Sequence, residues 1–144
     1  MPAVREALDR LAALDLSLWT EDAGPRVVVD RAGTVLVTSA PSREGRYGQR
    51  QFDAEEIDVV APFSIGDARG PDLHSPRPLL RIVPGKLGGA PHVAHTRLES
   101  QALGALAENG LAASKIYRLY PDVAPSAIDD ALDLEADLSA AVAA

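Results

Sequence analysis

The residue types that could support chemistry in this chain are its histidines and a glycine-rich run. His92 and His95 form an H-x-x-H sequence, and His74 is the third histidine of the chain. A zinc site needs three or four converging ligands, and residues three apart on a strand point to opposite faces. We therefore expect no metal site and no cofactor, and we interpret the histidines as turn or partner-contact residues.

Other patterns typical of enzymes are incomplete in the sequence. The run PGKLGG at 84–89 lacks the spacing of a phosphate-binding loop and carries Leu87 where Ser or Thr would hold Mg²⁺, so it predicts a glycine turn. The adjacent Asp129 and Asp130 would be splayed by about 100° on a helix, as solvated charges are. No G-x-S-x-G nucleophile elbow occurs, and the chain has no cysteine. These observations predict no enzymatic activity and no catalytic residue.

Charge is distributed unevenly along the 144 residues, which carry a formal charge of −7. Residues 74–98 contain four bases and no acid, whereas residues 99–144 contain two bases and eight acids. The cations of this half are the candidate contacts for a partner or for nucleic acid: Arg77, Arg81, Lys86, Arg97, Lys115 and Arg118. The alternative is that the basic strip, residues 77–97, pairs with the protein's own acidic helix.

The first part of the chain, residues 1–65, predicts a small α/β lobe. Apolar residues over 3–14 recur with the period of a helix, while charged residues take the other face. Two β-branched runs, 26–30 and 34–38, flank Gly33 and predict a β-hairpin. The lobe is therefore expected to consist of a small N-terminal helix and a hairpin, with a possible third strand near Tyr47–Phe52.

A short helix, a linker and a strand are expected between the hairpin and the C-terminal part. Asp53 begins a capping-box pattern that predicts a short helix carrying Ile57. Residues 66–78 are rich in Gly and Pro and predict an irregular linker. The strand-like run at 79–83 begins the second domain, 79–144, and its exposed edge could pair with the same strand of a second copy.

Three helical patterns close the sequence and predict a compact trihelical unit. Their bounds are 99–109, closed by Gly110, 113–120, closed by Pro121, and 125–142, opened by Pro125. Each pattern has one apolar stripe, and the stripe of the third includes Leu138 and Val142. Tyr117 and Tyr120 lie three apart on one helical face, and we expect them in the core.

The third helical pattern also has an acidic face. It places four aspartates within one arc opposite its apolar stripe: Asp129, Asp130, Asp133 and Asp137. We interpret this arc as solvent-exposed.

Thr96 and Glu99 have capping-box spacing before the first helix. For Arg97, which lies between them, a salt bridge to an acid of the third helix is favoured over a phosphate contact.

The segment 80–137 resembles the bacterial family called domain of unknown function 433, the small helix-turn-helix domains found in VapB-type antitoxins. Its turn has the family form Gly-x-Pro-x-apolar-x-x-Thr-Arg, and matching helix and turn positions follow in order. The matching residues are Gly89, Pro91, Val93, Thr96, Arg97, Leu103, Leu106, Gly110, Leu119, Tyr120, Pro121, Asp122, Ile128, Ala131 and Leu132. The resemblance implies a homeodomain-like three-helix domain with structural turns at Gly89, Pro91, Thr96, Gly110 and Pro121.

The expected protein is therefore an α+β antitoxin-like regulator. The resemblance implies that it binds and restrains a cognate toxin, a PIN-like ribonuclease, and regulates its own expression. The alternative is a DNA-binding transcriptional regulator that uses the basic strip, because the acidic third helix is unsuited to phosphate contacts. No apolar run approaches the ~18 residues that a membrane span needs, so we expect a cytoplasmic protein that contacts no membrane. We also expect a homodimer, formed through the N-terminal lobe or through the strand at 79–83.

Overall fold

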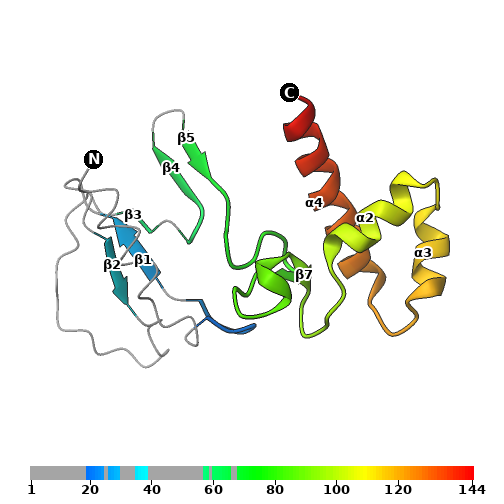
Figure 1. The fold of residues 1–144 in the computed structure, drawn as a ribbon, viewed down its shortest axis with the longest axis horizontal. Coiled ribbons are helices and arrows are strands. Elements are labelled where there is room, and N and C mark those ends of the chain that lie inside the picture. Colours follow the sequence, from blue (N-terminus) through cyan, green and yellow to red (C-terminus); the bar gives the residue numbers. More distant parts are fainter. Residues whose placement is uncertain (1–18, 25, 30–34, 39–56, 59, 66–67) are drawn as a thin grey trace. The chain divides into compact units, whose positions relative to one another are not determined.

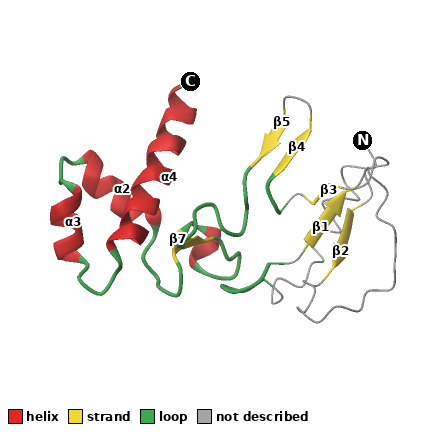
Figure 2. Cartoon of the chain, turned by 180° about the vertical axis from the view of Figure 1, so that it is seen from behind, coloured by secondary structure: helices red, strands yellow, loops and turns green. Residues whose placement is uncertain are grey.

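The computed structural model describes residues 19–24, 26–29, 35–38, 57–58, 60–65 and 68–144. The chain divides into two compact units, Met1–Leu73 and His74–Ala144. The described part of the first unit contains strands, and the second contains a short hairpin and three helices (Figures 1 and 2). The protein is thus a mixed α and β structure, as predicted.

The first unit contains a three-stranded antiparallel sheet in the order β2-β1-β3. The predicted hairpin strands are confirmed: β1 (Arg26–Val29) pairs with β2 (Val35–Thr38), and Val27 lies opposite Val37. The expected helix at Ile57 is wrong, since β3 (Ile57–Asp58) pairs with the other edge of β1. Pairing with β1 outweighs the local helical pattern because it satisfies backbone groups that β1 would otherwise leave open.

A second hairpin follows in the same unit. It consists of β4 (Phe63–Ile65) and β5 (Ala68–Gly70), with Phe63 opposite Gly70. Residues 68–70 therefore form a strand inside the segment expected to be an irregular linker, because β4 offers their backbone a partner. The predicted helix over 3–14, the strand near 47–52 and the capping box at Asp53 lie outside the described residues.

The second unit begins with a short hairpin of β6 (Leu80–Arg81) and β7 (His92–Val93). The connection contains the short 3₁₀ turn η2 (Leu87–Gly89), and both Gly88 and Gly89 have positive φ, at 62° and 80°. Glycine adopts this conformation without the steric penalty that a side chain brings. The predicted glycine turn at 84–89 is confirmed.

The three helices are α2 (Ser100–Glu108), α3 (Ala113–Leu119) and α4 (Pro125–Ala143), close to their predicted bounds. α2 ends in a Schellman motif, with Gly110 at φ 88°. The Leu111 N–H donates to the Leu106 carbonyl at 3.1 Å, and the Gly110 N–H donates to the Ala107 carbonyl at 2.9 Å. Pro121 follows the end of α3, and Pro125 lies in the first turn of α4.

The predicted capping box before α2 is wrong. Glu99 is the N-cap residue, and its side chain makes no capping hydrogen bond. The Thr96 hydroxyl instead donates to the Val93 carbonyl at 2.9 Å and accepts from the Leu98 N–H at 3.0 Å. Thr96 therefore stabilises the turn between β7 and α2, which leaves its hydroxyl no capping role.

All three helices and the β6–β7 hairpin contribute to one apolar core. Tyr117 and Tyr120 pack against it, which confirms their predicted place. The buried members of the core are Leu80, Val93, Leu103, Ile116, Ala127, Ile128, Ala131 and Leu134.

None of the helices in the described part of the chain has the combination of length and apolarity that a membrane span requires.

Candidate functional site

The acidic face of α4 holds a cation of the same chain. The Arg77 Nε donates to Asp133 Oδ2 at 2.7 Å, and its Nη2 donates to Asp137 Oδ2 at 2.5 Å. Asp133 and Asp137 are one helical turn apart and so present their carboxylates side by side. The expectation that the basic strip pairs with the protein's own acidic helix is confirmed for Arg77.

These ion pairs lie at the surface. The Arg77 side chain is 24% exposed, and those of Asp133 and Asp137 are 68% and 72% exposed. The hydrogen bond that Arg77 donates to Asp133 is the main cause that raises the pKa of Arg77 above its ordinary value. Exposed pairs typically contribute about 0.2–1 kcal/mol each because water screens them. Arg77 therefore fastens its segment to α4 only weakly.

The ion pair predicted for Arg97 is wrong. Arg97 is exposed and has no ion-pair partner among the residues that the structure describes. Arg77, and not Arg97, is the arginine that pairs with acids of the third helix, α4. No signal in the local sequence distinguishes the two arginines, because the Arg77 contact spans 56 residues.

The other two aspartates of the acidic arc also accept hydrogen bonds. Asp130 Oδ2 accepts from the backbone N–H of Leu79 at 2.9 Å, and Asp129 accepts from the Tyr117 hydroxyl. This bond to Asp129, followed by desolvation, raises the pKa of Tyr117. The arc is therefore not only a solvated face, since it fastens residues 77–79 and α3 to α4.

The outer edge of β6 is covered by the preceding segment, residues 74–79, which we call the strap. The Leu80 N–H donates to the Arg77 carbonyl at 3.1 Å, and the Ile82 N–H donates to the His74 carbonyl at 3.0 Å. The Leu80 carbonyl accepts from the Arg81 guanidinium at 2.6 Å. The expectation of an exposed strand edge at 79–83 is therefore wrong, because the strap and the Arg81 side chain already bond these groups.

Arg81 of β6 binds the strap through its side chain. Besides the Leu80 carbonyl, its Nη1 donates to Ser75 Oγ at 2.7 Å and to the Pro78 carbonyl at 3.0 Å. These three bonds hold one of the three nitrogens of the guanidinium within the unit. The predicted contact of Arg81 with a partner or with nucleic acid stays a prediction.

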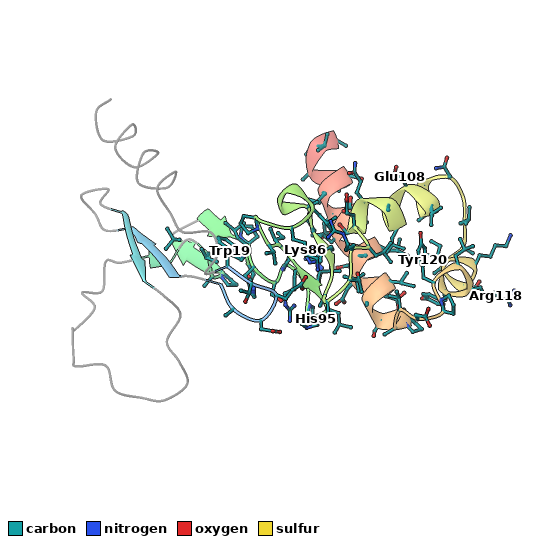
Figure 3. The ribbon with its side chains drawn as sticks, turned by 60° about the horizontal axis from the view of Figure 1, so that its bottom comes forward. Trp19, Lys86, His95, Glu108, Arg118 and Tyr120 are labelled. Atoms are coloured by element: carbon teal, nitrogen blue, oxygen red, sulfur yellow. The ribbon has the colours of Figure 1, made fainter. Side chains whose placement is uncertain are left out.

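The six candidate cations thus separate into different environments. Arg77 and Arg81 are bound within the unit, and Lys86 is half-buried. The exposed members are Arg97, Lys115 and Arg118. In Figure 3 the Arg118 side chain extends away from the helices. The structure does not gather the six residues into a single basic surface.

The two histidines of the H-x-x-H sequence lie in opposite environments. His92 is fully buried, and its Nδ1 lies 3.1 Å from the Ala90 carbonyl, to which it donates. His95 is exposed and has a positive φ of 61°. In the part of the chain that the structure describes, no group of three His, Cys, Asp or Glu side chains could hold a metal ion.

The C-terminal part of α4 presents apolar side chains to solvent. Its last buried residue is Leu134, whereas Leu138 is 46% exposed and Val142 is 88% exposed. The end of α4 extends beyond α2 in both ribbon views (Figures 1 and 2). The predicted stripe therefore packs in the core only as far as Leu134. The sequence signal for the exposed end of the stripe is helix length, because α4 has 19 residues whereas α2 has nine.

Sequence comparisons bear on the second unit only. A comparison with curated proteins and one with solved structures gave no match. Residues 81–134 match the model of the family described as "Protein of unknown function (DUF433)". The predicted resemblance to domain of unknown function 433 is thus confirmed for this segment, which runs from the second residue of β6 through β7, α2 and α3 to residue 134 of α4.

Proposed function

We propose that this protein is an antitoxin-like regulator whose second unit binds a partner protein. The supporting observation is the α4 tail, residues 135–143, where Leu138 and Val142 are exposed one helical turn apart. A water-exposed apolar stripe at the end of a helix is a typical protein-docking feature. Burial of both side chains against a partner would remove this apolar surface from water.

The charges on the other face of α4 indicate the chemistry of the partner. Asp133 and Asp137 lie opposite the apolar stripe, and their exposed carboxylates share the single cation of Arg77. A partner with an apolar groove and basic residues around it would be steered toward this helix. A PIN-like ribonuclease toxin, the partner class implied by the resemblance, is the candidate that we propose. The homeodomain-like arrangement of α2, α3 and α4 belongs to the same proposal.

Co-expression with the product of the neighbouring reading frame tests this function. We expect the two proteins to co-purify, and titration calorimetry to give an affinity that falls by roughly tenfold or more in L138S/V142S. A matched control is A102S/A105S, which places serines at exposed positions of α2. If the wild type and L138S/V142S bound the partner with equal affinity, the α4 tail would not be the docking surface.

A second candidate function is DNA binding. It would depend on Arg97, Lys115 and Arg118, because these cations are exposed whereas Arg77 and Arg81 are bound within the unit. It predicts binding to duplex DNA that weakens steeply with salt and is lost in the triple alanine variant. Binding that is insensitive to these substitutions would count against it.

A further inference from the structure

The turn that ends α2 contains an asparagine followed by a glycine. Asn109 is the single asparagine of the chain, and Gly110 follows it. Both residues are exposed. In an Asn-Gly sequence the backbone nitrogen of the glycine can attack the side-chain carbon of the asparagine, because glycine has no Cβ to obstruct the approach. Asn109 therefore has the sequence context for spontaneous deamidation, a modification that needs no enzyme.

Deamidation would replace the side-chain amide of Asn109 by a carboxylate. The Gly110 nitrogen loses its proton to water and forms a bond to Cγ of Asn109. The bond between Cγ and Nδ2 breaks, so that ammonia leaves and a cyclic succinimide remains. Water then opens the ring at either carbonyl carbon, which yields aspartate or isoaspartate at position 109. Water is the only co-reactant, and both residues are open to it.

The end of α2 keeps the two reacting groups apart. Asn109 has φ −78° and ψ 8°, so the Gly110 nitrogen is rotated away from the Asn109 side chain, and ring closure needs a large rotation about ψ. Asn109 Nδ2 donates to the Ala105 carbonyl at 2.7 Å, and the Gly110 N–H donates to the Ala107 carbonyl at 2.9 Å. Both hydrogen bonds must break before the nitrogen reaches Cγ.

Leu106 and Leu111 hold this turn closed. The Leu111 N–H donates to the Leu106 carbonyl at 3.1 Å, and both side chains are half-buried and pack against the core. An apolar contact between residues at these two positions frequently accompanies a Schellman motif. Helix ends open locally at a lower free-energy cost than the whole domain unfolds. The hold of Leu111 therefore sets how often the turn opens.

We propose that Asn109 is a deamidation site gated by the end of α2: the closed turn protects it, and opening of the turn allows irreversible conversion. The product does not restore the turn. A carboxylate cannot donate to the Ala105 carbonyl, and a negative charge is unfavourable at the C-terminus of a helix. Isoaspartate in addition lengthens the backbone by a methylene group, which displaces Gly110 from its capping position. A converted molecule thus keeps a weakened end of α2.

Incubation of the full chain at neutral pH, either folded or unfolded in guanidinium chloride, tests the protection. Intact-mass spectrometry detects the exchange of NH₂ for OH. Enzymatic methylation detects isoaspartate, which points to position 109 because no aspartate of the chain precedes a glycine. We expect the folded chain to convert at least about tenfold more slowly, which corresponds to an opening free energy of about 1.4 kcal/mol. Equal rates in the two states, or no conversion of the unfolded chain, would overturn the inference.

Two variants test whether the turn or the whole fold is the gate. Leu111→Ala loosens the turn and leaves Asn109 and Gly110 in place, whereas Val93→Ala lowers stability from the buried strand β7. We expect the folded Leu111→Ala chain to convert roughly tenfold faster than the wild type, and Val93→Ala to convert at the wild-type rate. Circular dichroism confirms folding, and Leu111→Val replaces Leu111→Ala if the latter is unfolded. An unchanged rate in the Leu111 variant, or equal acceleration in both variants, would overturn the gating.

Asn109→Asp reproduces the aspartate product and tests its effect on the turn. Its thermal midpoint should lie below that of Asn109→Gln, because glutamine is neutral and keeps an amide donor. The difference should shrink at acidic pH, where the introduced carboxylate is protonated. Asn109→Gln should also form no isoaspartate in either state. Equal midpoints of the two variants at neutral pH would overturn the claim that conversion weakens the end of α2.

Discussion

Gly104 of α2 lies directly against Glu135 of α4. A Cβ placed on Gly104 would come within 2.9 Å of both the Cβ and the Cγ of Glu135. The close approach lets the Glu135 carboxylate accept a hydrogen bond from the buried Ser100 hydroxyl at 2.5 Å. The glycine therefore sets how α2 crosses α4, and so where the α4 tail leaves the core.

The substitution Gly104→Ala tests this packing, because the close contact determines whether the free energy of unfolding rises or falls. Alanine gains about 1 kcal/mol in helix propensity over glycine, but overpacking costs about 1–3 kcal/mol where the contacted atoms cannot move away. We expect the free energy of unfolding, measured with urea, to fall by about 1 kcal/mol. The exposed control Ala105→Gly should lose only the propensity difference. A stabilised Gly104→Ala variant would contradict the close contact.

Arg77→Gln removes both ion pairs of the strap. We expect the free energy of unfolding to fall by about 1 kcal/mol at low salt, because the two pairs are exposed. The loss should shrink at high salt, where the Debye length is short. Arg97→Gln is the matched control, since Arg97 has no ion pair in the described part of the chain. Equal effects of the two substitutions would argue against the Arg77 contact.

Gly110→Ala tests the end of α2. Residue 110 has φ 88°, in the left-handed region, where a side chain costs roughly 1–2 kcal/mol. A Cβ added at Gly85 would meet open space, and the φ of Gly85 is not positive, so Gly85→Ala is the matched control. Thermal unfolding should show a lower midpoint for Gly110→Ala and little change for Gly85→Ala. Similar midpoints for both variants would exclude a Schellman motif at this position.

Tyr117 gives the fold an alkaline pH dependence. Its pKa is raised above the ordinary value of 10.0, mainly by the hydrogen bond to Asp129. The stabilisation by this bond is therefore fully present below pH 10 and is lost as pH rises through the raised pKa. We expect Tyr117→Phe to be less stable than the wild type at neutral pH, and the difference to vanish at high pH.

The control for Tyr117 is Tyr120→Phe. The Tyr120 hydroxyl makes no hydrogen bond among the described residues, although its ring packs against the same core. Because Tyr120→Phe removes a hydroxyl but no hydrogen bond, urea unfolding at neutral pH should show a smaller loss of stability for it than for Tyr117→Phe. A pH-independent effect of Tyr117→Phe would show that the ring, and not the hydrogen bond, is responsible.

The helices of the second unit could be predicted because local residues set their ends. Gly110, Pro121 and Pro125 each act on the backbone beside them, so the bounds of α2, α3 and α4 followed from the sequence. The β1–β2 hairpin followed in the same way from its two runs of β-branched residues. At Ile57 the local pattern failed, because pairing with β1 depends on a distant strand, in which Val29 lies opposite Ile57.

The candidate site was less predictable because its contacts are distant in sequence. Arg77 and Arg97 look alike locally, and only the path of the strap places Arg77 between Asp133 and Asp137. The exposure of Leu138 depends on how far α2 reaches along α4, which periodicity does not give. The periodicity predicted the apolar stripe but not its division into a core part and an open part; the signal for that division was the greater length of α4 than of α2.

Hydrogen exchange over residues 135–143 tests the docking role of the α4 tail most directly. It would be measured in the full chain, alone and in complex with the product of the neighbouring reading frame. A partner that buries Leu138 and Val142 should slow exchange of the tail amides, with little change in α2. A stable complex in which the tail exchanges as fast as in the free chain would contradict the account.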